Sequence, residues 1–186
     1  MSVLETIKKR FSCRKFEQKP VEKEKINKII ESARLSPSAM NQQAWFFRVV
    51  TNQKKNDEIG AIIEPLIFEK FPGMKQSKSP GQRSVLHYDA PVVIYCSVYR
   101  EAFHMKYIDL GLAVESMALE AEELGLGAVI VGFSSEFGTE HVSKALGIDE
   151  SKEEYILSLA VGYAADGYQN PKRPRKKVEE IAAFIE

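Results

Sequence analysis

The fold is decided by the stretch YIDLGLAVESMALEAEEL, residues 107–124. At about 3.6 residues per turn, its apolar side chains lie on nearly every side of a helix. A helix that is apolar all round is buried, whereas an amphipathic helix lies on the surface. Gly125 follows directly and is well placed to cap the helix, because glycine adopts the left-handed conformation easily. The stretch therefore predicts a long buried helix at the centre of the molecule.

The segments on either side of this helix predict a layered protein. Apolar runs rich in β-branched and aromatic residues predict about four strands, at residues 45–51, 90–99, 127–133 and 155–162. Helical spacing of apolar residues predicts helices at residues 2–11, 22–36, 54–71, 140–146 and 178–185. Because helices alternate with strands, the class is α+β or α/β with one layered core.

Local signals mark the ends of several helices. Ser2 and Glu5 form a capping box, in which each side chain satisfies a backbone N–H of the first turn. Pro37 is expected to end the second helix, since the residue before a proline avoids the helical region. Pro65 is expected to kink or divide the third helix. Gly147 closes the short helix before it.

Length and composition indicate one ordinary globular domain. The chain has 186 residues, which favours a single domain spanning residues 1–186, with residues 72–82 as a lid within it. No signal peptide and no apolar run of roughly 18 residues is present, so we expect a cytoplasmic protein without a membrane partner. Lys+Arg and Asp+Glu each number 26, and a net charge of zero argues against a nucleic-acid partner.

Several familiar sites are missing from the sequence. There is no phosphate-binding loop of the G-x-x-x-x-G-K type. A dinucleotide fingerprint starting at Gly125 fails, because Ile130 stands at its third glycine position and the turn leads from helix to strand. The three histidines have no metal-ligand spacing, and we expect no metal and only surface or packing roles for them. Cys13 is read as a small residue in a loop, and Cys96 as a core residue.

Three segments remain that can carry chemistry: 10–16 (RFSCRKF), 36–47 (SPSAMNQQAWFF) and 171–177 (PKRPRKK). Taken singly, the basic segments are typical of a solvated face and the middle one of a turn. Taken together with DLGLA at 109–113, MALEA at 117–121 and LGLG at 124–127, they resemble the nitroreductase family in order and spacing. That family carries R-R-S-x-R-x-F, then A-P-S-x-x-N-x-Q-P-W, then D-x-G-x-A in a long apolar helix, and ends on a basic pair.

Two positions depart from the family pattern. Phe11 stands where the family often has a second basic residue, and Ala44 stands where it often has proline. Neither change is expected to abolish flavin binding, although Ala44 leaves the backbone before Trp45 with more freedom.

The resemblance implies a nitroreductase-like α+β fold. Its parts are a central mixed, mainly antiparallel sheet, flanking helices, a long buried central helix and an intertwined homodimer with FMN at the interface. It implies a set of cofactor-binding residues: Arg10, Phe11, Ser12, Arg14, Pro37, Ser38, Ala39, Asn41, Val131, Gly132, Phe133, Arg173 and Arg175.

The roles implied for these residues differ by segment. Arg10, Ser12 and Arg175 correspond to the FMN phosphate site, with Arg173 as a further candidate, and Arg14 to the basic residue that tunes the flavin near N1 and O2. The loop at 37–41 corresponds to the one that reaches FMN from the other subunit. Val131, Gly132 and Phe133 correspond to a strand end whose backbone N–H reaches flavin N5.

The implied reaction is hydride transfer from NADH or NADPH, through flavin N5, to a small organic acceptor such as a nitroaromatic or a quinone. The order is ping-pong and needs no catalytic side chain, because the cofactor does the chemistry. Alternatives within the fold are an ene-reductase, a dehalogenase or a flavin-fragmenting enzyme. Outside it stands a protein that stores or senses flavin without turnover.

Overall fold

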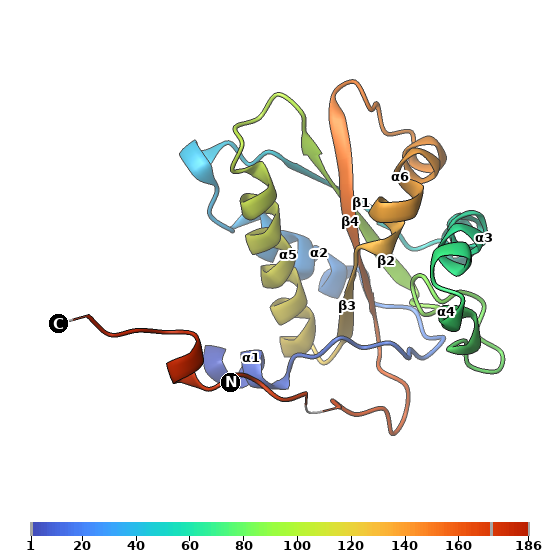
Figure 1. Ribbon diagram of the computed structural model, residues 1–186, viewed down its shortest axis with the longest axis horizontal. Helices are drawn as coiled ribbons and strands as arrows, with labels where there is room; N and C mark the ends of the chain where they lie inside the picture. The colour runs from blue at the N-terminus through green and yellow to red at the C-terminus, as the bar shows by residue number, and fades with distance from the viewer. Residues whose placement is uncertain (1, 172, 186) are drawn as a thin grey trace.

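Four strands form one sheet at the centre of the molecule (Figure 1). From edge to edge they are β1 (Trp45–Val50), β2 (Val92–Tyr99), β4 (Glu153–Gly162) and β3 (Gly127–Val131). The computed structural model describes residues 2–171 and 173–185. Every neighbouring pair is antiparallel, so the expected mixed sheet is wrong for this chain. The one parallel contact in the described ranges is an isolated bridge between Ser12 and Ala128. The segment that contains Ser12 does not continue along β3, since Phe16 instead pairs with Ala164 after β4.

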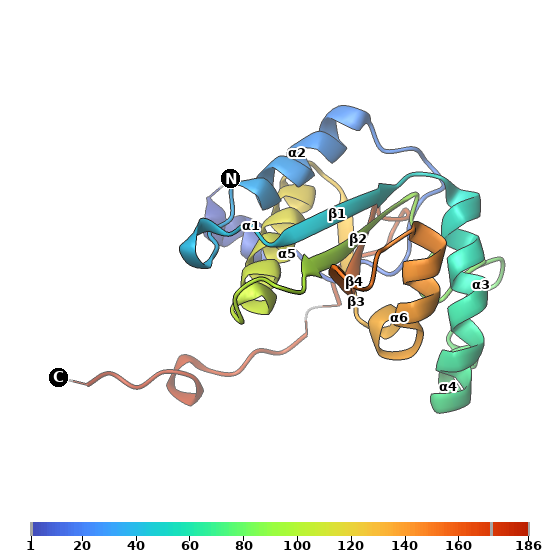
Figure 2. The ribbon, with the colours of Figure 1, turned by 90° about the horizontal axis from the view of Figure 1, so that it is seen from above.

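Helices cover both faces of the sheet (Figures 1 and 2). One face carries α1 (Val3–Lys9), α2 (Lys23–Arg34) and α5 (Lys106–Glu123). The other face carries α3 (Gln53–Lys70), the short α4 (Gly73–Gln76) and α6 (Phe133–Leu146). Single 3-10 turns occur at η1 (Ala39–Asn41) and η2 (Val178–Glu180). The fold is therefore α+β in three layers.

The core has two parts, one on each side of the sheet. Along β2, Ile94 and Cys96 pack with the α2 and α5 side chains, whereas Val93 and Tyr95 pack with those of α3 and α6. This alternation is the two-residue period of a strand. Both faces of β2 are buried because it is a central strand, and each large buried side chain stabilises the fold by about 1.5–3 kcal/mol.

The central helix α5 differs from its prediction in one respect. Leu110, Val114 and Met117 are buried, as expected for the face against the sheet. Its opposite face also carries large apolar side chains but is open to solvent, since Ile108 is 56% and Leu112 45% exposed. Burial all round is therefore wrong within a single chain, because the chain supplies a covering layer for one face only.

The helices expected at 2–11 and 22–36 end two residues early, at Lys9 and Arg34, and two further helices differ more. The helix expected at 140–146 begins seven residues earlier, at Phe133, directly after Gly132. The sequence pattern did not predict this first part, because the non-helical Gly138 interrupts the helical spacing of apolar residues. The terminal helix expected at 178–185 is limited to the 3-10 turn at Val178–Glu180. Its apolar side chains have no surface of this chain to pack on, and so short a helix is marginal by itself.

The capping signals were read correctly. The Ser2 N–H donates to Glu5 Oε2 at 2.8 Å, and the Glu5 N–H donates to Ser2 Oγ at 3.3 Å. Gly125 and Gly147 take positive φ angles of 74° and 64° after their helices. The prediction that Pro65 could divide the third helix is wrong, because α3 runs unbroken through this residue. Among the helices described, none is long and apolar enough to cross a membrane.

Candidate functional site

The two ends of the chain meet beside β3. The Glu17 N–H donates to the Tyr163 carbonyl at 2.9 Å, and the Ala165 N–H donates to the Lys15 carbonyl at 3.0 Å. Further along, Asn170 Nδ2 donates to the Lys9 carbonyl at 3.3 Å. These bonds align residues 9–17 with residues 163–170, so the basic segments at both ends come together.

A small basic pocket results from this meeting. Its volume is about 150 Å³, and its lining is Arg10, Phe11, Ser12, Arg14, Asn170, Pro171, Arg173 and Arg175. Every candidate residue from the two terminal segments is therefore in one place, while Lys172 of the basic tail segment lies outside the described residues. Asn170 was missed by the sequence analysis, although it directly precedes the basic segment.

The side chains of this pocket suit an anion. Arg10 Nε lies 3.5 Å from Glu115 Oε1, while Arg14 and Arg175 donate to backbone carbonyl oxygens of Ser12 and Arg173 at 3.5 and 3.1 Å. The lining contains no carboxylate. Planar guanidinium groups match a phosphate, since each can bind two of its oxygens at once. The donor set therefore fits the phosphate of FMN.

Cys13 holds the pocket segment against β3 rather than serving as a reactive thiol. It is fully buried, and burial raises the pKa of its thiol. A Cβ at Gly127 would come within 2.7 Å of its side chain, so only glycine allows this approach. The Cys13 N–H donates to the Ala128 carbonyl at 3.0 Å, which fixes Ser12 and Arg14 beside the strand.

The outer edge of β3 continues the site. The Ala128 carbonyl faces this edge, since it accepts from Cys13. Backbone polar groups alternate sides along a strand, so those of Ile130 and the N–H of Gly132 face the same edge. In the described part of the chain no strand pairs there beyond Ala128. A Cβ built on Gly132 would meet no atom within 4 Å, so the space beside this amide is open.

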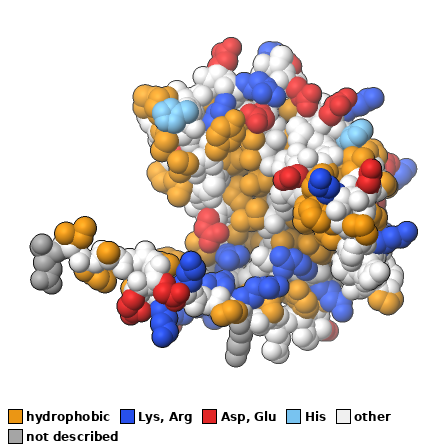
Figure 3. Space-filling view, viewed as in Figure 1, with side chains coloured by type: hydrophobic (Ala, Val, Ile, Leu, Met, Phe, Trp, Pro, Cys, Tyr) orange, Lys and Arg blue, Asp and Glu red, His pale blue; other side chains and the backbone are white. Residues whose placement is uncertain are grey.

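Figure 3 shows this region as a hollow. Hydrophobic side chains cover its middle, over the sheet between α5 and α6, and Lys and Arg side chains lie along its lower border. An apolar floor with a basic end suits a ligand with a flat ring and an anionic tail.

Aromatic rings flank the Gly132 amide. Phe133, the first residue of α6, is stacked on Phe137 with ring centroids 6.1 Å apart, and Phe71 at the end of α3 lies 5.8 Å from each. The prediction that Phe133 belongs to the strand is wrong, because α6 begins there. Phe71 and Phe137 were not predicted, although Phe133 and Phe137 have the four-residue spacing of one helix face.

The loop at 37–41 lies away from the basic pocket of the same chain. The Ala39 N–H donates to Asp109 Oδ2 at 3.1 Å, which fixes the loop at the first turn of α5. None of the residues of this loop lines the basic pocket, and Arg10 of the pocket lies 3.5 Å from Glu115, six residues further along α5 than Asp109. Six residues of helix span about 9 Å. One chain therefore does not bring all the candidate residues together.

The backbone of this loop is strained. Met40, Asn41 and Gln43 have positive φ angles of 53°, 54° and 47°, a region that residues other than glycine rarely adopt. Pro37 and Asn41 are exposed, and Met40 is 71% exposed. Such strain is retained at functional sites when the surroundings enforce it.

The three histidines differ in burial. His104 and His141 are exposed, whereas His87 is buried with Nε2 3.0 Å from Ser158 Oγ. Burial lowers the pKa of His87 to about 3, so this imidazole is neutral at physiological pH. Within residues 2–171 and 173–185, no three His, Cys, Asp or Glu side chains gather as metal ligands.

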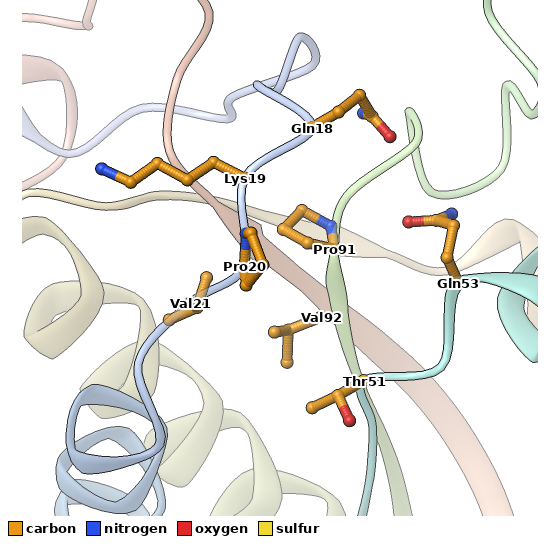
Figure 4. Close-up of a pocket in the computed structure, with 8 residues that line it drawn as sticks. All are labelled: Gln18, Lys19, Pro20, Val21, Thr51, Gln53, Pro91 and Val92. Carbon is orange, nitrogen blue, oxygen red and sulfur yellow. The ribbon is translucent and has the colours of Figure 1, made fainter.

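A second cavity lies at a different part of the sheet and lacks these features. Figure 4 shows it between the segment at 18–21, the residues just after the end of β1 and the start of β2, and its volume is about 230 Å³. Lys19 is the ionisable residue of its lining, and its Nζ already lies 4.0 Å from the centre of the Tyr163 ring. One paired cation does not make a phosphate site.

Known proteins share this fold and sequence pattern. A solved nitroreductase with bound FMN from Desulfitobacterium hafniense DCB-2 is 25% identical with a TM-score of 0.80, and each chain is covered completely. One from Bacteroides fragilis NCTC 9343, also with bound FMN, has a TM-score of 0.84 at 24% identity and full coverage of both chains.

Sequence comparison agrees with the structural one. A protein of Methanothermobacter thermautotrophicus named "Putative NADH dehydrogenase/NAD(P)H nitroreductase" is 30% identical over 168 residues, which is 89% of this chain and 79% of that protein. The model of the nitroreductase family matches residues 7–163. A match over most of its length, on this fold, means that the chain belongs to the nitroreductase family.

Proposed function

We propose that this protein is an FMN-dependent oxidoreductase that passes hydride from NADH or NADPH to a small planar acceptor, a nitroaromatic or a quinone. The observation that carries the proposal is the arginine-lined pocket, built from both ends of the chain and continued by the open edge of β3. Relatives of the same fold that have FMN bound support the choice of cofactor.

The phosphate of FMN is assigned to the basic pocket. Arg10 and Arg175 offer guanidinium donors from opposite ends of the chain, with Arg173 beside them, and Ser12 adds a hydroxyl. Arg14 follows Ser12 on the side of the open strand edge. There its positive charge would stabilise the negative charge that reduced flavin carries at N1 and O2.

The flavin ring is assigned to the hollow beside β3. The N–H of Gly132 faces the open edge, and the missing side chain lets a ring approach the backbone. Val131 and Phe133 flank this amide, and the aromatic group of Phe71, Phe133 and Phe137 forms a wall on which a planar acceptor can stack. When bound, FMN supplies the N5 position that accepts and passes on hydride.

We assign the functional unit to a homodimer. Large apolar side chains are exposed together on α1 and on the outer face of α5, among them Val3, Leu4, Ile108 and Leu112. Exposed apolar patches of this kind mark interaction surfaces. The loop at 37–41 does not line the pocket of its own chain, so a second copy packed along α5 can bring its own loop to the flavin.

The C-terminal tail supports an intertwined form of this dimer. It extends away from the body of its own chain (Figures 1 and 2). Ile181, Phe184 and Ile185 are 70%, 87% and 95% exposed. Side chains of this size gain stability only when covered, so the tail is assigned to the surface of the second copy.

The same geometry implies ping-pong kinetics. The chain has no separate nicotinamide fingerprint, because Ile130 replaces its third glycine. Donor and acceptor must then use one hollow in turn, and the acceptor's proton comes from solvent. Double-reciprocal plots at several acceptor concentrations should be parallel. Under anaerobic conditions, NADH or NADPH should reduce the flavin before any acceptor is added.

Screening nitroaromatic, quinone, enone and halogenated phenol acceptors in this assay separates the possible activities. Intersecting lines, or reduction that requires the acceptor, would contradict the single hollow. Bound flavin that neither nicotinamide reduces would instead favour a protein that stores or senses flavin.

A further inference from the structure

Tyr155 lies on β4 at a β-bulge that changes the direction of its side chain. Cys96 of β2 is opposite Leu157, but the next residue, Ser97, is opposite Tyr155, so Ile156 is the extra residue. Without the bulge, Tyr155 would share a face with Leu157 and Leu159. With it, Tyr155 joins Ala160 in the core beneath α3 and α6. Bulges commonly re-aim one side chain in this way.

The re-aimed hydroxyl makes a buried hydrogen bond. Tyr155 Oη lies 2.5 Å from Ser134 Oγ, and Ser134 is fully buried. Buried polar groups are costly unless they are paired, so each of the two hydroxyls holds the other in place.

Ser134 belongs to the first turn of α6, two residues after Gly132. This helix has no side-chain hydrogen bond at its N-cap, and Gly132 and Phe133 are both exposed. The Ser134 hydroxyl ties this turn to the sheet, in addition to the packing of Phe133 on Phe71. Removing this hydrogen bond loosens the turn that carries the Gly132 amide.

We propose that Tyr155 and Ser134 are positioning residues that hold the Gly132 N–H toward flavin N5. The inference rests on the proposed function, because it takes the flavin to lie at the open edge of β3. Nothing in it requires these side chains to touch substrate. They act through the backbone that they hold.

The test compares two tyrosine variants that each lose one buried hydroxyl. Tyr155→Phe removes the bond to Ser134, and the matched control Tyr95→Phe removes the 3.1 Å bond to Asn56 on the same side of the sheet. A double variant, Tyr155→Phe with Ser134→Ala, removes both partners and leaves no unpaired hydroxyl between them. The readouts are the Kd for FMN, the midpoint potential of bound flavin, and amide hydrogen exchange of residues 132–135 in the flavin-free protein.

Tyr155→Phe and the double variant should weaken FMN binding by about 2- to 12-fold, the loss of one net hydrogen bond. Hydrogen exchange at 132–135 should become faster without flavin. The potential should become less negative, because an N–H donated to N5 favours the oxidised flavin, in which N5 carries no proton. Tyr95→Phe should have the same Kd for FMN, the same exchange rates and the same midpoint potential as the wild type.

Two results would overturn the inference, and they are distinguishable. If wild type binds FMN while Tyr155→Phe keeps its affinity, potential and exchange rates, the hydrogen bond is only structural and the proposed function stands. If wild type takes up no FMN, the proposed function fails and the inference fails with it.

Discussion

Four arginine guanidinium groups lie around one small pocket, although like charges repel each other. The group consists of Arg10, Arg14, Arg173 and Arg175, and the carboxylate of Glu115 lies near Arg10 alone at 3.5 Å. A bound dianion relieves this repulsion and satisfies guanidinium donors that now contact backbone carbonyls. The cluster is thus better explained by binding than by folding stability.

Arg175→Ala should weaken FMN binding with little change in stability, since the side chain is exposed and, among the described residues, its hydrogen bonds stay within its own tail. One charge-assisted hydrogen bond is worth about 1.5–3 kcal/mol, or about 10- to 150-fold in Kd. Fluorescence titration with FMN measures the change. Arg34→Ala is the matched control, because Arg34 is an exposed arginine on α2 paired with Glu31. Equal Kd values for both variants would show that the tail cluster is a solvated face.

His87 should make the protein less stable in acid. Its pKa is about 3 in the folded protein against 6.5 ordinarily, so only the unfolded chain takes up a proton between pH 7 and 5. The free energy of unfolding should fall by about 2 kcal/mol over this range. Urea unfolding at several pH values measures it. His87→Gln should remove most of this dependence of the unfolding free energy on pH. An unchanged dependence in this variant would mean that other titratable groups cause it.

Among the residues that line the candidate site, those that belong to local motifs could be grouped from the sequence. Arg10, Ser12 and Arg14 lie within five residues. Residues so close in sequence are close in space in any fold. Ser134 and Tyr155 could not be predicted, because their contact depends on a bulge that shifts the register of β4 by one residue. Asn170 was missed for a similar reason, since its partner is the Lys9 carbonyl at the other end of the chain.

The helix α5 carries two apolar faces, and the chain covers one of them. The buried face packs on the sheet, and the outer face presents Tyr107, Ile108 and Leu112 at 47%, 56% and 45% exposure. Periodicity alone detects that a helix is apolar all round, but not which neighbour covers each face. The same limit applies to the tail, where an apolar pattern predicted a helix that lacks a surface of its own chain to form on.

Leu112→Glu should separate the proposed dimer. In a two-fold interface the change occurs twice, and two central contacts of about 2 kcal/mol each raise the dimer Kd by roughly three decades. Light scattering at micromolar concentration measures the mass. Ile62→Glu is the control, because Ile62 is equally exposed at 46% but lies on α3, on the other side of the sheet. An FMN-loaded monomer in the wild type would contradict the dimer.

At the scale of the whole molecule, the site is made where the chain's ends meet at a sheet edge. The sequence order places Arg10 and Arg175 far apart, and the bonds between residues 15–17 and 163–165 bring them together. The class, the four strands and α5 could be predicted, since they rest on long periodic segments. The strand order, the open edge of β3 and the exposed faces depend on which segments pair, and the sequence pattern does not encode that pairing locally.

The measurement that tests the central claim most directly is a flavin titration of the purified protein, with FMN and riboflavin compared. The two ligands differ by the phosphate alone, so the comparison isolates the basic pocket. Two charge-assisted bonds to the phosphate predict that FMN binds at least about 100-fold more tightly than riboflavin. Denaturation of the loaded protein should release FMN and no FAD. Equal affinity for the two flavins, or no uptake of either, would contradict the account.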